Sequence, residues 1–224
     1  MKKFGFGAMR LPLIDSQDKS SIDMEELKKM VDEFMAAGFT YFDTAFPYHE
    51  QLSENALKEA LVDRYDRDSY IFADKMPTVL VKSGDEYPMY FNKQLEKTGV
   101  GYFDYYLMHN MGRDRYFNTD KWGGFDFARR MKEEGKIKKF GFSFHDDAEM
   151  LDQILTEHPE VDFVQLQINY LDWDNKIIQS RACYETARKY NKPIVVMEPV
   201  KGGTLASLPK EAASLLYEYA PGVL

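Results

Sequence analysis

The sequence predicts an α/β fold, a (β/α)8 barrel of the TIM type that is truncated before its eighth strand. Short apolar stretches alternate with amphipathic helical patterns along the chain, which is typical of βαβ units around a parallel sheet. Polar residues stand at the ends of several apolar stretches, where barrel folds carry their active sites. A typical barrel of this class has about 250 residues, whereas this chain has 224.

The predicted strands are short and rich in aromatic and β-branched residues, as buried parallel strands usually are. They comprise residues 4–9, 39–43, 70–75, 103–109, 137–143, 163–167 and 194–198. We expect residues 1–224 to form one barrel domain that is incomplete at its C-terminal end. Its two edge strands would then carry unpaired backbone groups, which favours self-association.

The helix between the first two strands is the clearest one. Asp23 is its expected N-cap, Glu26 follows three residues later, and Gly38 ends it. Ser53 is the expected N-cap of a second helix at 53–62. Further helices are predicted at 86–97, 125–134, 147–157, 180–190 and 209–219.

Composition and charge exclude several classes of function. Hydrophobic residues make up 44% of the chain, which is enough for a sizeable core, and the net charge is -8. This charge argues against nucleic acid as a partner, because phosphate binding depends on clustered Lys and Arg. No stretch resembles a signal peptide or approaches the roughly 20 apolar residues that span a membrane. Cys183 is the only cysteine, which suits a cytoplasmic protein.

Asp43, Tyr48, Lys75 and His109 stand at or just after the ends of three predicted strands. Since the carboxyl ends of parallel strands meet at one end of a barrel, we expect these side chains to converge. A tyrosine with its ordinary pKa of about 10 donates a proton poorly near neutrality, and the Lys75 ammonium would lower that pKa. Asp43 would hold Lys75 in an ion pair, and a neutral His109 would orient a substrate carbonyl.

This set of residues predicts carbonyl reduction, in which a nicotinamide supplies hydride and Tyr48 protonates the developing alkoxide. Each residue by itself also fits a structural role, such as a strand-to-strand ion pair for Asp43 and Lys75. A binding or sensor module without turnover is a second hypothesis. A barrel hydrolase with a metal ion on Asp43, His109 and His145 is a third, which Lys75 disfavours because an ammonium repels a cation.

The segment after His109 is expected to form a long loop. Its neighbouring methionines and aromatic residues either line a substrate pocket or pack in the core. They are Met108, Met111, Tyr105, Tyr106, Tyr116 and Phe117. Two further histidines, His49 and His145, lie near the predicted active face, where they would contact substrate or simply be solvated.

The chain resembles the aldo-keto reductase family in a series of motifs that occur in the family's order. The motifs are GFGAMRLP, FDTAFPYHEQLSENALKEAL, FADK, YYLMHN, GFSFH, VQLQINYL and EPVKGGTLA. The resemblance implies an NADP-dependent reductase of small aldehydes or ketones. It also implies that Asp43, Tyr48, Lys75 and His109 are the catalytic tetrad, with Tyr48 as general acid.

The same resemblance implies a nicotinamide site along the ends of four strands. Its residues would be Gly7, Met9, Ser143, Gln165, Met197, Gly202 and Gly203, with Ser143 and Gln165 at the carboxamide. Phe144 replaces an Asn found in many members, and Met197 replaces a ring that stacks on the nicotinamide.

Part of the sequence is similar to one branch of the family, which carries a C-terminal ferredoxin-like iron–sulfur segment. The cysteines of that segment are absent, so we expect this chain to bind no cluster. The loop that holds the adenosine 2′-phosphate after the eighth strand is absent as well. Impaired cofactor binding, and a sensor role with it, is therefore the alternative to an active NADPH enzyme.

Overall fold

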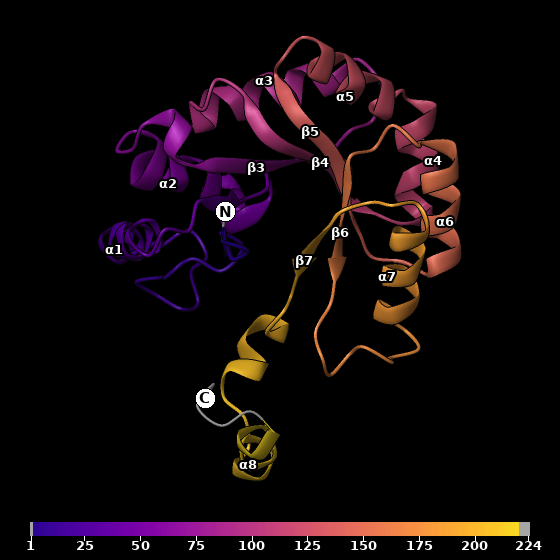
Figure 1. The fold of residues 1–224 in the computed structure, drawn as a ribbon. Coiled ribbons are helices and arrows are strands. Elements are labelled where there is room, and N and C mark those ends of the chain that lie inside the picture. Colours follow the sequence, from indigo (N-terminus) through magenta and orange to yellow (C-terminus); the bar gives the residue numbers. More distant parts are fainter. Residues whose placement is uncertain (1, 220–224) are drawn as a thin grey trace.

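The computed structural model describes residues 2–219. Seven parallel strands form one sheet in which every strand lies beside the next one in the sequence. Figure 1 shows the sheet curling into a partial barrel with helices along its outer side. The strands are β1 (Gly5–Gly7), β2 (Tyr41–Asp43), β3 (Ile71–Met76), β4 (Phe103–Met111), β5 (Ile137–Phe144), β6 (Phe163–Gln167) and β7 (Ile194–Met197).

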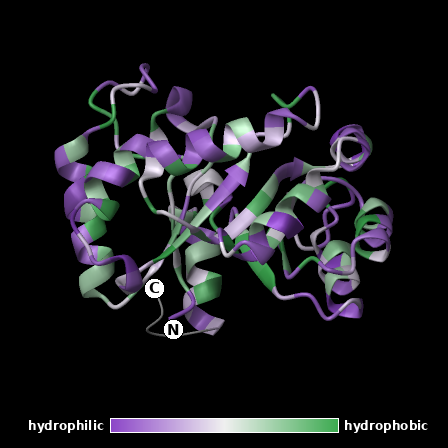
Figure 2. Cartoon of the chain, turned by 90° about the horizontal axis from the view of Figure 1, so that it is seen from above, coloured by the Kyte–Doolittle hydropathy of each residue, from purple (hydrophilic) through white to green (hydrophobic). Residues whose placement is uncertain are grey.

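The helices follow the strands closely. Figure 2 shows them around the sheet with green and purple segments on each, as expected of amphipathic helices. They are α1 (Met24–Ala36), α2 (Ser53–Leu57), α3 (Glu86–Thr98), α4 (Arg113–Lys121), α5 (Gly124–Glu133), α6 (Ala148–Glu157), α7 (Ser180–Lys189) and α8 (Lys210–Tyr219), with helical turns η1 (Tyr48–Gln51), η2 (Lys58–Val62), η3 (Arg67–Ser69) and η4 (Lys201–Ala206).

The predicted start of α1 is confirmed. The Asp23 carboxylate accepts a hydrogen bond from the Glu26 amide at 3.0 Å, and Gly38 follows the helix with a φ of 78°. The predicted cap at Ser53 is wrong. Ser53 is the first residue of α2, and its hydroxyl instead donates to the Ala8 carbonyl at 3.1 Å and lies 2.8 Å from the Thr44 hydroxyl.

The predicted long loop after His109 is also wrong, because α4 occupies much of it. This helix buries only Tyr116 and Thr119, so its sequence shows little apolar periodicity. The strand before it also runs two residues past the predicted end at His109. A register shift near Asn110, which has a φ of 56°, bends β4 before it ends at Met111.

The two faces of the sheet have different roles. Because side chains alternate between faces, Phe72, Tyr106 and Phe142 pack against the helices. Ala73, Leu107 and Phe163 form a smaller apolar cluster on the other face. The register places polar residues on that second face, nearer the strand ends. These polar residues are Asp43, Lys75, His109, Ser143 and Gln165.

The C-terminal part of the structure is loosely covered. No residue of β7 is fully buried, and α8 buries none of its residues. Leu215, Tyr217 and Tyr219 of α8 are exposed, and Figure 1 shows this helix away from the other helices. Within residues 2–219, no helix is long and apolar enough to cross a membrane.

Candidate active site

Lys75 lies among the other three predicted catalytic residues, Asp43, Tyr48 and His109, and is only 1% exposed. We call these four residues the polar cluster. Its ammonium forms an ion pair with Asp43 and donates to the Thr44 carbonyl at 2.7 Å. Burial by itself would lower the pKa of Lys75, but Asp43 and its other acidic neighbours together raise it above its ordinary value. The lysine therefore stays charged although it is buried.

Tyr48 lies beside this ammonium. The distance from the Lys75 Nζ atom to the Tyr48 hydroxyl is 3.4 Å, and Nζ is 5.0 Å from the centre of the ring. Burial is the strongest influence on the pKa of Tyr48 and raises it, while Lys75 acts in the opposite direction. The lowering influence predicted for Lys75 is present, but burial outweighs it, and the pKa of Tyr48 is raised above 10 on balance. Tyr48 consequently keeps its proton at neutral pH.

His109 completes the cluster. Its ring meets the Tyr48 ring edge to face, with centroids 5.7 Å apart and an interplanar angle of 83°. Burial, followed by the charge of Lys75, holds the pKa of His109 well below its ordinary value. The imidazole is therefore neutral near pH 7. The four predicted residues do lie together, and their catalytic role remains a prediction.

Two residues of the predicted nicotinamide site adjoin the cluster. Gln165 donates from Nε2 to the Asp43 carboxylate at 3.0 Å, and Ser143 lies opposite it on β5. The Ser143 hydroxyl oxygen accepts from the Asn110 amide at 2.7 Å. The bend in β4 thus brings a backbone donor to Ser143.

The other predicted cofactor residues lie in or just after the two edge strands of the sheet, β1 and β7. Gly7 pairs with Asp43 in the sheet, and an added Cβ atom there would meet nothing within 4 Å. Met9 is exposed and Met197 ends β7. Gly202 and Gly203, with φ of 63° and 97°, lie in η4.

One ion pair joins the segments that follow the two edge strands, β1 and β7. Arg10, after β1, lies 2.9 Å from Glu198, which follows β7. Among residues 2–219, no hydrogen bond links Met9, Met197, Gly202 or Gly203 to the tetrad.

The predicted metal site of the hydrolase hypothesis is not formed. In the described part of the chain, no three His, Cys, Asp or Glu side chains are placed to hold a metal ion. Asp43 is instead occupied by Lys75 and Gln165. The proposed substrate-lining role of the residues around His109 also fails for most of them. Met108, Met111, Tyr106 and Tyr116 are buried in the core.

Asp74, Glu54 and Gln94 form a buried polar cluster next to Lys75 that was not predicted from the sequence. Asp74 accepts from the Lys75 amide at 2.8 Å, and Gln94 donates to the Lys75 carbonyl at 3.0 Å. Gln94 also donates to Glu54 at 3.0 Å and accepts from Tyr106. The sequence signal for this cluster was Asp74, a carboxylate within a buried strand, because a buried carboxylate has to find polar partners.

Comparison with solved structures supports the fold. The structure is similar to an aldo-keto reductase from Bacillus halodurans in its holo form, with a TM-score of 0.69 and 20% identity over 99% of this chain and 74% of that one. A thermostable aldo-keto reductase bound to the inhibitor epalrestat gives a TM-score of 0.70 and 21% identity, covering 98% and 75%. An aldo-keto reductase from Klebsiella pneumoniae in complex with NADPH gives 0.65 and 16%, covering 91% and 66%. These likenesses establish a common fold.

A sequence search of curated proteins finds no match. The model of the Aldo/keto reductase family, in contrast, matches residues 3–215. That match covers nearly the whole sequence and includes every residue of the cluster described above. The chain therefore belongs to the aldo-keto reductase family of oxidoreductases.

Proposed function

We propose that this chain is an NADP-dependent oxidoreductase that reduces an aldehyde or ketone to an alcohol, with Tyr48 as the proton donor. One observation carries the proposal. A buried ammonium, held by Asp43, lies 3.4 Å from the hydroxyl of Tyr48, which is half-buried. Such an ammonium has no apolar packing role, but it stabilises a phenolate that forms beside it.

The residues present fit a nicotinamide. Gln165 uses its amide nitrogen for Asp43, which leaves its oxygen as an acceptor for a carboxamide. Among the described residues, none accepts the hydroxyl hydrogen of Ser143, whose oxygen is occupied by Asn110. An acceptor and a donor therefore stand side by side, as a carboxamide requires. The open space above Gly7 leaves room for a flat ring against the backbone.

The chain's own residues would then act as follows. The bound nicotinamide supplies hydride to the carbonyl carbon. Neutral His109 hydrogen-bonds the carbonyl oxygen and directs it to Tyr48. Tyr48 transfers its hydroxyl proton to that oxygen, and the phenolate left behind is stabilised by Lys75. Asp43 keeps Lys75 charged and in place throughout.

A turnover assay tests the proposal. Loss of reduced-nicotinamide absorbance would be followed with NADPH and a panel of small aldehydes and ketones. Tyr48→Phe is expected to reduce turnover by about 10²- to 10⁴-fold, because it removes the general acid. Tyr170→Phe is the matched control, since Tyr170 is an exposed tyrosine. Wild-type turnover in a folded Tyr48→Phe variant would exclude Tyr48 as the donor.

The sparse packing of β7 and η4 favours a second function, that of a sensor module. Three of the predicted cofactor residues, Met197, Gly202 and Gly203, lie in β7 and η4, which contain no buried residue. A site with so little packing would bind nicotinamide weakly, which suits a sensor module. Fluorescence titration with NADPH and with NADH separates the two functions. Saturable binding without turnover of any carbonyl would favour the sensor.

Self-association is part of the proposal. Strands β1 and β7 are the edges of the sheet, and apolar side chains are exposed near both of them. These include Phe4, Met9, Val196 and Val200. Exposed parallel edges with apolar neighbours favour pairing with another chain. Sedimentation velocity is expected to show oligomers, and a monomer at all concentrations would contradict this.

The single cysteine, which is buried, supports a cytoplasmic location.

A further inference from the structure

The turn that carries Tyr48 has an unusual backbone. The next three residues, His49, Glu50 and Gln51, have φ of 49°, 54° and 71°. None of them is glycine, and L-residues rarely adopt this left-handed region because the Cβ atom approaches the carbonyl oxygen. Such a conformation persists only where surrounding contacts impose it.

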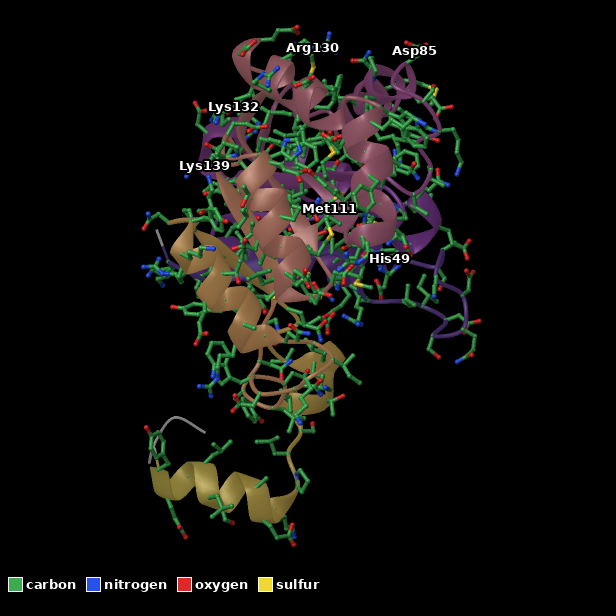
Figure 3. All side chains as sticks on the ribbon, turned by 90° about the vertical axis from the view of Figure 1, so that its right-hand side faces the viewer. His49, Asp85, Met111, Arg130, Lys132 and Lys139 are labelled. Atoms are coloured by element: carbon green, nitrogen blue, oxygen red, sulfur yellow. The ribbon has the colours of Figure 1, made fainter. Side chains whose placement is uncertain are left out.

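His49 provides contacts of that kind. Its ring is only 8% exposed. The Leu11 amide donates to Nε2 at 2.9 Å, and Nδ1 lies 2.9 Å from the Lys19 carbonyl. Both partners belong to the loop between β1 and α1, far from His49 in the sequence. Figure 3 shows His49 close to the purple loop that extends beside it.

These two contacts define the state of the ring. The Leu11 amide can only donate, so Nε2 must carry no hydrogen. The Lys19 carbonyl can only accept, so Nδ1 must carry one. His49 is therefore a neutral imidazole in the Nδ1–H form. The expectation that His49 is a solvated loop residue or a substrate contact was wrong.

We propose that His49 is a positioning residue that clamps the Tyr48 turn to the loop between β1 and α1, and so sets the distance between Tyr48 and Lys75. This inference rests on the proposed role of Tyr48 as proton donor. Apart from the contact between Lys75 and the Tyr48 hydroxyl, the turn's other hydrogen bonds are local, from Tyr48 to Ala45 and from Leu52 to His49, or come from the side chain of Lys97 to Gln51. None of those holds the residue next to Tyr48 by its buried side chain.

The His49 clamp also links Tyr48, the proposed acid, to the segment that follows β1. Leu11 follows Arg10, which forms the ion pair with Glu198 beyond β7. The same loop begins just after Gly7 and contains Met9, two of the predicted cofactor residues. His49 thus ties the position of Tyr48 to the segment against which a nicotinamide would lie.

Three substitutions separate the two halves of the clamp. His49→Ala removes both hydrogen bonds, His49→Asn offers an amide nitrogen near the position of Nδ1, and His49→Gln offers an amide oxygen near the position of Nε2. Lys19→Ala is the matched control, because the bond from His49 goes to the backbone carbonyl, which that variant retains.

The first readout does not depend on turnover. The Tyr48 phenol would be titrated by carbon-13 NMR of its Cζ atom, assigned with Tyr48→Phe. Burial raises the pKa of Tyr48 and Lys75 lowers it, so a Tyr48 ring that leaves its place changes both influences. His49→Ala is expected to shift that pKa away from the wild-type value, with smaller shifts in Asn and Gln and none in Lys19→Ala. A wild-type titration in folded His49→Ala overturns the proposal. Nitrogen-15 NMR of wild-type His49 must also show the neutral Nδ1–H form, and any other form overturns the proposal even if His49→Ala does not fold.

The second readout is kinetic. In an active chain, His49→Ala is expected to lower kcat by up to about 10²-fold, the usual effect of misplacing a reacting group by about 1 Å, while the KM for NADPH changes less than about twofold. Equal kcat in His49→Ala and wild type also overturns the proposal. A wild type without any turnover would refute the proposed function alone, because the NMR titration would still decide the role of His49.

Discussion

Two regions of the molecule differ sharply in how well they are packed. In β3, five of the six residues are buried, and Lys75 there has partners on both its side chain and its backbone. In β7 no residue is buried, and the same is true of η4 and α8. We call strands β2–β4 with the Tyr48 turn the acid side, and β7, η4 and α8 the open side.

This difference in packing separates the groups proposed to deliver the proton from those proposed to bind the cofactor. The acid side holds the groups that would deliver a proton, and its ion pair and hydrogen bonds fix them without any ligand. The open side holds Met197, Gly202 and Gly203, which would contact a nicotinamide, on segments with little packing. The groups proposed to deliver the proton are therefore preorganised, whereas a nicotinamide would have to order part of its own site on binding.

The largest expected effect of a single change lies on the acid side. Lys75→Met would leave the Asp43 carboxylate, which is 15% exposed, without its partner. Breaking a buried ion pair in this way lowers the free energy of unfolding by about 3–5 kcal/mol. Urea denaturation followed by circular dichroism measures this. A loss below about 1 kcal/mol would mean that Lys75 is not held as tightly as its contacts indicate.

A pair of leucines in two amphipathic helices compares the packed core with α8 of the open side. Leu27 in α1 is fully buried, whereas Leu215 in α8 is 69% exposed. Leu27→Ala is expected to cost about 2–5 kcal/mol of unfolding free energy, because it leaves a cavity. Leu215→Ala is expected to change it by less than about 0.5 kcal/mol. Similar losses in both variants would show that α8 is packed in solution, for example in an oligomer.

The pH dependence of stability reports on His109. Its pKa is held well below 6.5 in the folded chain, so below pH 6.5 the unfolded chain binds the proton more readily. Stability from this residue is present above pH 6.5 and is lost as the pH falls, by at most about 1.4 kcal/mol per pH unit. Parallel urea unfolding of wild type and His109→Gln tests this. The variant should lose less stability on acidification, and parallel curves would contradict the burial of His109.

The smallest expected effect is at the ion pair between the segments that follow the two edge strands, β1 and β7. Arg10 and Glu198 form an ion pair whose side chains are 57% and 23% exposed. Exposed pairs contribute about 0–1 kcal/mol, so Arg10→Met should lower the unfolding free energy by no more than that. The comparison with Lys75→Met is matched, since both variants replace a cation by methionine. A loss above about 2 kcal/mol would show that this pair holds the two edges together.

Much of the fold could be predicted from the sequence for a physical reason. Buried parallel strands are apolar on both faces, so β6 has the predicted bounds and the other strands differ from prediction by one or two residues at an end. Helix caps made by a local side chain, such as Asp23, were equally visible. The convergence of Asp43, Lys75 and Tyr48 followed from their positions at neighbouring strand ends.

The features that the sequence did not predict depend on tertiary contacts. Ser53 resembles an N-cap, but its hydroxyl bonds to Ala8 and Thr44. The burial of Tyr48, which decides the direction of its pKa, has no local signature in the sequence. The ring of His49 finds its partners in a loop almost 40 positions away, and the sequence does not indicate that pairing.

Hydrogen–deuterium exchange of the whole chain, with and without saturating NADPH, tests the central claim most directly. Without cofactor, amides of β3 and β4 should be strongly protected, whereas those of β7 and η4 should exchange fast. With NADPH, protection should increase in β7 and η4 and change little in β2–β4. Unchanged exchange everywhere at saturating NADPH would contradict a nicotinamide site on this chain, and equal protection of both regions without cofactor would contradict the difference between the acid side and the open side.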